Sequence, residues 1–370
     1  MDKQTALHSY HAAHAKKMGE FAGYDMPFYY EAGVMAEHNA VRDKLGLFDV
    51  SHMGQIQLSG EGVAAFFESI TPSAFSAAKD GMAKYTMMTN EDGGMIDDLI
   101  VTRLNEDVFF AVINAGCKDK DIAWIRSNLP ADITLEIFED RALIAVQGPE
   151  AEKALSLCIG EDLSQLGYMR MAKYGDVWVS RLGYTGEDGF EVSVTNQDAL
   201  GLWNALIDQG GALPCGLAAR DSLRLEMGYP LYGHDIDAMT SPIEADLSWV
   251  VRKKDSDFIG GAIIAAHREN GAARKRVGLA LIDKGIAREG VKILNADGEE
   301  VGIVTSGGHS PTLNKAIAMG YVLSEYSAPE TILFLEVRGR KLKAAITPLP
   351  FVKASTKSNK AQSANSGKAA

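Results

Sequence analysis

Two segments on either side of a polar turn give the clearest local pattern in the chain. Residues 84–89 are typical of a short strand, and residues 95–101 form a second, mainly apolar segment. Between them lie Asn90, Asp92 and two glycines, a composition typical of a hairpin turn. The sequence therefore predicts two antiparallel strands joined at this turn.

The second predicted strand carries two adjacent carboxylates, Asp97 and Asp98. Side chains alternate along a strand, so the two aspartates should point to opposite faces and cannot share a proton. At least one of them must then lie among apolar groups, where an ionised carboxylate is costly unless it is hydrogen-bonded or paired. The local pattern leaves two interpretations open: a solvated edge-strand residue beside a turn-supporting one, or a functional carboxylate.

The sequence around this hairpin predicts an antiparallel sheet with helices over residues 49–138. Further strands are expected at 55–58 and 108–114. The segment GEGVAA at 60–65 fits the fingerprint of a dinucleotide-binding loop, and Asp80 follows at the required spacing. The residues just before this acid do not form a buried strand, so we interpret the segment as a plain strand, turn and helix.

The stretches that flank this region predict one discontinuous α+β domain, formed by residues 1–48 and 139–250. Near the start of the chain, helices are expected over residues 5–18 and 32–45, and residues 19–30 between them resemble an aromatic loop.

The second stretch of this domain contains another predicted hairpin, over residues 174–195. Its return strand has apolar side chains on one face and Glu191 on the other, where a solvated residue is the simplest interpretation. A helix is expected over residues 217–227. Arg220 lies in a charged stripe of this helix, which is either an exposed salt-bridged face or an anion-facing patch.

The character of the chain changes after Trp249. Residues 251–275 are expected to form a charged linker and a helix. Alternating segments separated by Gly-containing turns then predict a β-barrel domain over residues 276–353. Residues 354–370 contain no apolar side chain larger than alanine, so a disordered tail is expected there.

Composition narrows the classes of function. The chain has 370 residues, enough for two or three domains, and its formal net charge of −12 argues against nucleic acid as the main partner. No apolar run approaches a membrane span, and no secretory signal is apparent. Three widely separated cysteines suggest reduced thiols in a cytoplasmic protein. His8, His11 and His14 spread too widely around a helix for a zinc site, so no metal is predicted.

Several motifs together resemble the aminomethyltransferase family, the T-protein of the glycine cleavage system. In chain order they are FDVSHM at 48–53, GGMIDDLIV at 93–101, VQGP at 146–149, GYTGEDGFE at 183–191, GLAARDSLRLE at 216–226, YGHD at 232–235, SP at 241–242, DFIG at 257–260 and TSG at 305–307. Each motif alone is weak, but the ordered set is specific and spans residues 1–353.

The resemblance implies an α+β fold with three lobes in a cloverleaf arrangement, in which a C-terminal β-barrel domain helps to enclose a central folate site. It implies an enzyme that acts on the aminomethyl group carried by the dihydrolipoyl arm of the H-protein. Tetrahydrofolate would be the co-substrate that takes the one-carbon unit, giving 5,10-methylenetetrahydrofolate and ammonia. No metal, nucleic acid or membrane is implied.

The resemblance also implies roles for individual residues. Asp97 would be the catalytic carboxylate beside the reactive folate nitrogens, orienting the folate and favouring positive charge on the transferred carbon. Glu191 would accept two hydrogen bonds from the pterin amino and ring N–H groups, and Arg220 would be a further folate contact. The remaining walls of the folate site would be Tyr85, Asn114, Tyr184 and Trp249.

Two other functions of the same fold remain alternatives. Folate-dependent demethylases tend to lack the Asp-Val-Ser-His-Met and paired-aspartate patterns that are intact here. A non-catalytic folate-binding adaptor would carry a Lys-Gly-Cys-Tyr-x-Gly-Gln-Glu signature, whereas DFIG occupies the corresponding region. The chain departs from the family at Ala262, where a larger or basic residue is usual. It also departs at Lys353, where relatives often have arginine with its planar two-donor fork.

Overall fold

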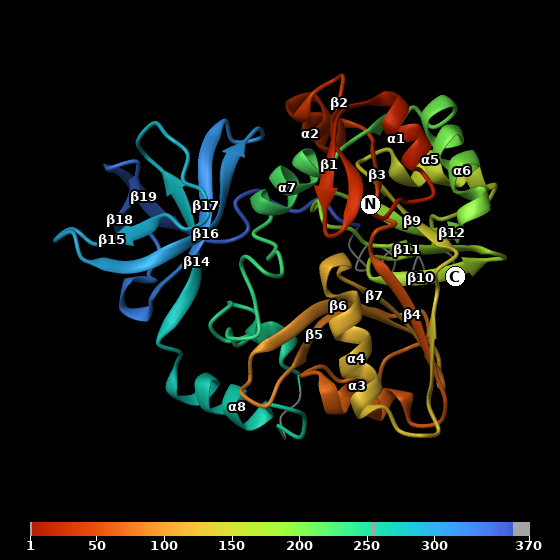
Figure 1. Ribbon diagram of the computed structural model, residues 1–370, viewed down its shortest axis with the longest axis horizontal. Helices are drawn as coiled ribbons and strands as arrows, with labels where there is room; N and C mark the ends of the chain where they lie inside the picture. Colours follow the sequence, from red (N-terminus) through yellow and green to blue (C-terminus); the bar gives the residue numbers. More distant parts are fainter. Residues whose placement is uncertain (1, 253–255, 358–370) are drawn as a thin grey trace, which may run out of the picture.

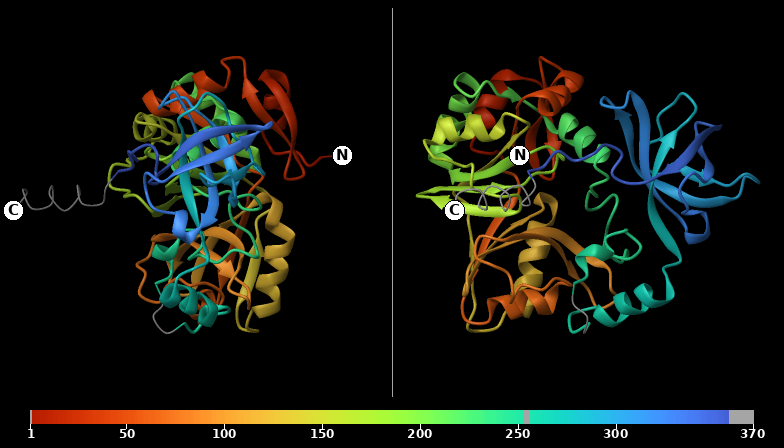
Figure 2. Two further views of the ribbon diagram at one scale, coloured as in Figure 1. Left: turned by 90° about the vertical axis from the view of Figure 1, so that its left-hand side faces the viewer. Right: turned by 180° about the vertical axis from the view of Figure 1, so that it is seen from behind.

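The computed structural model describes residues 2–252 and 256–357, which form three lobes (Figure 1). Two lobes combine helices with an open sheet, and the third is a closed barrel formed by the C-terminal part of the chain. The view from behind in Figure 2 again shows the three lobes side by side. The predicted α+β fold with a C-terminal barrel is therefore confirmed.

The first lobe combines the start of the chain with residues that follow the second lobe. Its sheet has the strand order β10-β11-β12-β9-β3-β13. The strands are β3 (Gly46–Asp49), β9 (Arg141–Gln147), β10 (Arg170–Tyr174), β11 (Val177–Arg181), β12 (Gly189–Thr195) and β13 (Leu213–Pro214). The helices are α1 (His8–His14), α2 (Val34–Asp43), α5 (Ala151–Ile159), α6 (Asn196–Asp208) and α7 (Leu217–Glu226). Apolar side chains of the sheet pack against α5 and α6 around the buried Trp203.

The start of the chain differs from the sequence-based expectation. The helix predicted over residues 5–18 is confined to α1 and ends at His14. The loop predicted over residues 19–30 is instead part of a hairpin of two strands, β1 (Ala15–Phe21) and β2 (Tyr24–Tyr30).

The hairpin was not predicted because its stabilising contacts are remote in sequence. Most residues of β1 are at least partly exposed, so no clean alternation of apolar and polar positions marks the strand. Strand β2 packs closely on the start of α7: a Cβ added to Gly216 would lie 2.3 Å from the carbonyl oxygen of Phe28. The turn itself depends on Ala22 and Gly23, which both have positive φ angles.

The second lobe is an antiparallel five-stranded sheet covered on one face by two helices. The strand order is β5-β6-β7-β4-β8, with strands β4 (Gly54–Ser59), β5 (Ala83–Thr89), β6 (Met95–Asn105), β7 (Val108–Ile113) and β8 (Thr134–Ile137). The helices are α3 (Val63–Ile70) and α4 (Lys118–Asn128), and a 3₁₀ turn, η1 (Ala115–Cys117), precedes α4. Strand β4 leads through Gly60 and Gly62 into α3, as the plain strand–turn–helix interpretation predicts.

A linking segment follows α7 of the first lobe, passes along the second lobe and leads to the barrel. It contains a 3₁₀ turn, η2 (Ser248–Val250), and the helix α8 (Gly261–Asn270). The barrel closes in the order β14-β17-β16-β15-β18-β19. Its elements are β14 (Arg274–Leu281), β15 (Lys292–Leu294), β16 (Glu300–Ser310), β17 (Lys315–Leu323), η3 (Ser324–Tyr326), β18 (Ile332–Val337) and β19 (Arg340–Thr347).

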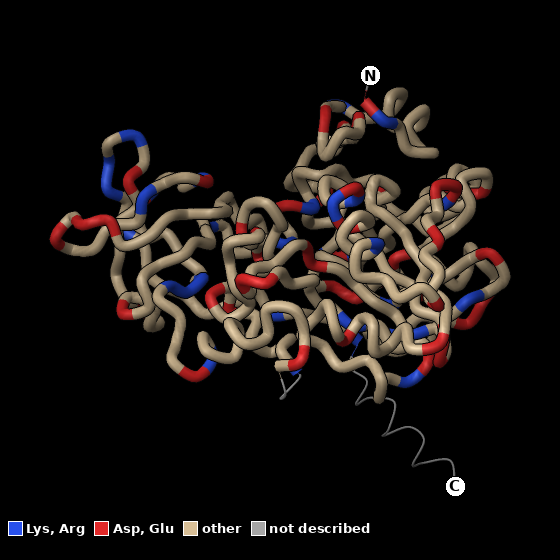
Figure 3. Tube along the Cα trace, turned by 60° about the horizontal axis from the view of Figure 1, so that its bottom comes forward, with Lys and Arg blue, Asp and Glu red and all other residues tan. Residues whose placement is uncertain are grey.

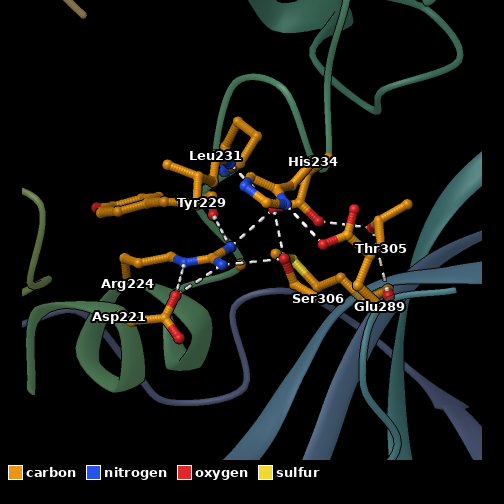
Figure 4. A network of polar contacts seen from close by, with 12 residues as sticks. Asp221, Arg224, Tyr229, Leu231, His234, Glu289, Thr305 and Ser306 are labelled. Carbon is orange, nitrogen blue, oxygen red and sulfur yellow. Dashed lines mark hydrogen bonds and ion pairs between the residues drawn. The ribbon is translucent and has the colours of Figure 1, made fainter. Parts of the chain in front are cut away.

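Helix α7 is joined to the barrel by a buried polar network (Figure 4). Nη1 of Arg224 lies 2.7 Å from the carboxylate of Asp235, and the Ser306 hydroxyl lies 2.9 Å from both side chains. At the end of α7, the carboxylate of Glu226 accepts a hydrogen bond of 2.8 Å from the Thr312 hydroxyl, between β16 and β17. Removing one partner of a buried ion pair typically costs about 3–5 kcal/mol. This network therefore fixes the orientation of the barrel on the first lobe.

Charged side chains of both signs are spread over the lobes (Figure 3). In this view of the described residues, lysines and arginines are interspersed with aspartates and glutamates along the chain. None of the helices in the described ranges has both the length and the apolar character that crossing a membrane requires.

Residues 354–357, predicted to begin a disordered tail, instead lie against the first lobe. The backbone N–H of Ser355 donates a hydrogen bond of 2.8 Å to the carbonyl of Gly186, and the Lys357 ammonium donates one of 2.8 Å to Glu152. The prediction of disorder is wrong for these four residues. It rested on their lack of apolar side chains, whereas polar contacts hold them in place. The rest of the predicted tail, residues 358–370, lies outside the described residues.

We expect truncation after Lys353 to lower the Tm by about 2 °C. The truncation removes the partly exposed ion pair between Lys357 and Glu152 and the few hydrogen bonds of residues 354–357 to the first lobe, which together contribute roughly 1 kcal/mol. Truncation after Lys357 is the matched control and should leave the Tm unchanged. Differential scanning calorimetry of the two truncated proteins tests this, and equal melting temperatures would show that residues 354–357 add nothing to stability.

Candidate active site

The candidate site lies where the sheets of the first two lobes face each other. On β6, Asp98 shares a strand face with Ile100 and Thr102. Ile100 and Thr102 line a small cavity together with Glu191 and Ser193 of β12. Asp98 and Glu191 therefore lie on facing surfaces of two different sheets.

Asp98 is held by two side chains from neighbouring strands. The Tyr85 hydroxyl of β5 donates a hydrogen bond of 2.9 Å to one carboxylate oxygen, and Nδ2 of Asn114, after β7, donates one of 2.7 Å to the other. Burial and, next in size, the negative charge of Asp97 raise the pKa of Asp98, the hydrogen bonds from Tyr85 and Asn114 lower it, and the net result is a pKa of about 7. The carboxyl group is thus poised to change charge near neutral pH.

Asp97, the residue predicted to be catalytic, lies on the other face of β6. It shares that face with Leu99 and Val101, which belong to the core beneath α3 and α4, and its own exposed fraction is 0%. Its carboxylate accepts hydrogen bonds from the backbone N–H of Asn114 at 3.2 Å and from the Asn114 side chain at 2.9 Å. The alternation predicted for the two aspartates is present, but the structure places Asp98 rather than Asp97 opposite Glu191.

Glu191 and Arg220 form the other side of the site. Burial raises the pKa of Glu191 above its usual value, and the positive charge of Arg220 offsets part of that increase. Nη1 of Arg220 is buried without a hydrogen-bond partner among the described residues. Its guanidinium lies 4.9 Å from the centre of the Tyr184 ring. A buried donor without a partner is costly, so this arrangement is suited to a polar ligand that completes its hydrogen bonds.

Aromatic side chains line the two ends of the site. Tyr85 is stacked on Trp249 with ring centroids 5.7 Å apart, and Tyr184 is stacked on Tyr229 at the same distance. Trp249 is 54% exposed. The structure therefore brings together all six predicted folate-site residues, with Asn114 shared between the two aspartates.

The histidines near the start of the chain are used in structural contacts. Nε2 of His8 lies 2.9 Å from Asp25, Nε2 of His11 lies 2.9 Å from Asp49, and Nδ1 of His14 lies 2.8 Å from the carbonyl of Tyr10. These side chains point to three different partners and do not share a metal-binding position.

Models of two known domains match the chain. The model described as the GCVT N-terminal domain matches residues 7–255, and the glycine cleavage T-protein C-terminal barrel domain matches residues 274–353. The chain belongs to the glycine cleavage T-protein family. The resemblance inferred from the ordered motifs is thus confirmed.

Individual members of the T-protein family match over nearly the whole chain. An aminomethyltransferase of Bacillus licheniformis is 42% identical over 95% of this chain and 99% of its own length. One of Chloroherpeton thalassium is 41% identical, with the same coverage of both chains. The crystal structure of the glycine cleavage system aminomethyltransferase T from Bartonella henselae has a TM-score of 0.93 and 36% identity, covering 97% of this chain and 100% of that chain.

Within this T-protein fold, the sequence carried only a weak signal that Asp98 faces the site. Asp97 shares its face with Leu99 and Val101, which are both apolar, whereas Asp98 shares its face with the polar Thr102. That difference favours Asp98 for the more polar side of the strand. Deciding between the aspartates also requires knowing which face α4 covers, and helix packing is not readable from the strand alone.

Proposed function

We propose that the space between Asp98 on β6 and Glu191 on β12 is the tetrahydrofolate site of an aminomethyltransferase. The chain moves the one-carbon unit of the aminomethyl group on the dihydrolipoyl arm of the H-protein to tetrahydrofolate, and ammonia is released. The observation that carries this proposal is that Nη1 of Arg220 is buried beside Glu191 without a hydrogen-bond partner among the described residues.

The polar groups fit a bound pterin. Glu191 offers two carboxylate oxygens, which match a pair of N–H donors on one edge of a planar ring. Nη1 of the Arg220 guanidinium has no acceptor in the part of the chain that the structure describes, so it can bind a carbonyl oxygen of the same ring. The stacked Tyr85 and Trp249 provide an aromatic wall for such a ring. Bound tetrahydrofolate supplies the nitrogens that accept the one-carbon unit.

Asp98 takes the role that the sequence-based interpretation gave to Asp97. Its carboxylate is fixed by Tyr85 and Asn114, so it is oriented before substrate binds. When ionised, it places a negative charge in a largely buried position where positive charge develops on the transferred carbon, and such fixed charges stabilise transition states strongly. Asp97 lies behind it and supports Asn114.

Replacing Tyr85 with phenylalanine should move the acidic limb of the pH–rate profile to higher pH by about 1 unit. The hydrogen bond from Tyr85 lowers the pKa of Asp98, so its loss raises that pKa. A hydrogen bond to a charged group contributes roughly 1.5 kcal/mol, and one pKa unit corresponds to about 1.4 kcal/mol. Since the ionised form of Asp98 is the active one, kcat/KM for tetrahydrofolate should rise with pH through about 7 in the unmodified protein and later in the variant.

Tyr174→Phe, on β10 at the edge of the first lobe, is the matched control for this pH profile. It removes the same hydroxyl group without touching Asp98, and its acidic limb should coincide with that of the unmodified protein. An unshifted limb in Tyr85→Phe would exclude Asp98 as the group that titrates.

Turnover with aminomethylated H-protein tests the reaction as a whole. A folate-dependent demethylase would instead release its one-carbon unit from an N-methyl or sulfonium substrate, and an adaptor would bind tetrahydrofolate without turning it over. Formation of methylenetetrahydrofolate and ammonia in equal amounts supports the transferase, and binding without product would contradict it.

We place the reaction in the cytoplasm because Cys117, Cys158 and Cys215 are all free thiols.

A further inference from the structure

Asp121 is a buried carboxyl group that the proposed reaction does not use. It lies in the first turn of α4, its exposed fraction is 0%, and neither of its oxygens accepts a hydrogen bond from a donor among the described residues. One carboxyl oxygen of Asp121, one of Asp97 and the Cys117 sulfur all lie within 4.8 Å of one another. A buried polar group in this position must be satisfied in some other way.

The buried Asp121 carboxyl group can be satisfied if either Asp121 or Asp97 carries a proton and donates it in a hydrogen bond to the other. Two ionised carboxylates in contact repel each other, and neither can donate a hydrogen bond to the other. Asp97 already accepts two hydrogen bonds from Asn114, which stabilise its anionic form. No donor within residues 2–252 and 256–357 reaches Asp121, so the proton belongs on Asp121, whose O–H then donates to Asp97.

The charged and titratable groups around Asp121 agree with this assignment. Burial is the largest of the effects that raise the pKa of Asp121 to about 10, followed by the hydrogen bond and charge of Asp97, with a smaller contribution from the charge of Asp98. The positive charge of Lys120 lowers the pKa of Asp121. However, the Lys120 ammonium already donates hydrogen bonds to the Tyr232 hydroxyl, 2.9 Å away, and to the carbonyl of Ile96.

Cys117 is not a competing anion. Burial raises the pKa of its thiol to about 12, so the sulfur keeps its proton at neutral pH. A divalent cation would require the opposite arrangement, with the thiol and both carboxyl groups ionised.

We propose that Asp121 is a positioning residue which, in its neutral form, donates a hydrogen bond to Asp97 and so holds Asn114 against Asp98. The chain of contacts runs from α4 to the site: Asp121 fixes the Asp97 carboxylate, and Asp97 fixes the backbone and side chain of Asn114. Nδ2 of Asn114 is then directed at the Asp98 carboxylate, 2.7 Å away. The protonation of Asp121 follows from the surroundings of its own carboxyl group, whereas the effect of Asp121 on turnover rests on the proposed function of Asp98.

Infrared spectroscopy tests the proton without any substrate. Protein labelled with ¹³C in its aspartate carboxyl groups, measured at about pH 8.5, should show the carbonyl band of a neutral carboxylic acid, because this pH is above the pKa of Asp98 and below that of Asp121. The band should disappear in Asp121→Asn and remain in Asp119→Asn, a control at an exposed position on the same helix. No loss of an acid band in Asp121→Asn would overturn the proposal.

Kinetics tests the positioning role. The asparagine amide can donate to Asp97 as the neutral acid does, so Asp121→Asn should keep kcat within about threefold. Asp121→Ala removes the donor and should lower kcat by about tenfold or more, since small displacements of a catalytic group are costly. Equal losses in the two variants would overturn the proposal, as would a stoichiometric divalent cation that Asp121→Asn releases. If the alanine variant does not fold, the asparagine variant and the infrared band still decide.

Discussion

Replacing Asp98 with asparagine should lower turnover by roughly 10²–10³-fold, equivalent to about 3–4 kcal/mol of transition-state stabilisation. The asparagine side chain has the same size, and Tyr85 and Asn114 can still contact it, but the negative charge opposite Glu191 is gone. Because the charge acts on the transition state, the loss should appear in kcat, with the affinity for tetrahydrofolate much less affected. The measurement is the formation of methylenetetrahydrofolate from aminomethylated H-protein, with tetrahydrofolate affinity determined in parallel.

Asp92→Asn provides a matched control for this variant. It makes the same chemical change in an exposed position of the turn that precedes β6, and turnover should be unchanged. Asp97→Asn addresses the assignment itself, since Asp97 lies on the covered face. We expect a smaller loss of turnover there, together with a lower Tm because a buried hydrogen-bond network is disturbed. A folded Asp97→Asn protein with a greater loss than Asp98→Asn would return the catalytic role to Asp97.

Replacing Glu191 with alanine should weaken tetrahydrofolate binding by on the order of 2–3 kcal/mol, or roughly 30–150-fold in Kd. Two charge-assisted hydrogen bonds to the pterin are lost, and the Arg220 charge is left without its counter-charge. The side chain is partly exposed and lies beside a cavity, so the protein should still fold. Titration calorimetry with tetrahydrofolate gives the affinity directly.

The control for Glu191→Ala is Glu336→Ala, which truncates an exposed glutamate on β18 of the barrel. It removes an equal charge from a strand of similar kind and should leave the affinity unchanged. If Glu191→Ala bound tetrahydrofolate as tightly as the unmodified protein, Glu191 would be the solvated strand residue that its local sequence pattern suggests.

The sequence alone predicted the elements whose conformation is determined mainly by residues close together in the chain. The hairpin around Asn90 and Asp92 follows from turn-forming residues between apolar segments, and the barrel follows from repeated alternation with glycine turns. Both patterns reflect physical preferences of neighbouring residues, so a single sequence is sufficient to reveal them.

The features that the sequence alone did not determine depend on contacts between distant residues. The hairpin of residues 15–30 is held by α7, and residues 354–357 are held by polar groups of the first lobe. The choice between Asp97 and Asp98 depends on which face of β6 is covered by α4. None of these contacts leaves a periodic pattern in the local sequence, although alternation correctly separated the two aspartates onto different faces.

The position of β3 in its sheet affects how the protein can form during synthesis. Strand β3 ends at Asp49 and pairs with β9 and β13, which begin at Arg141 and Leu213, so its partners leave the ribosome much later. The strands of the second lobe are contiguous in the chain and can pair with one another as they emerge. Strand β3 must therefore remain without its sheet partners while a lobe encoded after it folds, and the order of synthesis is not the order of folding.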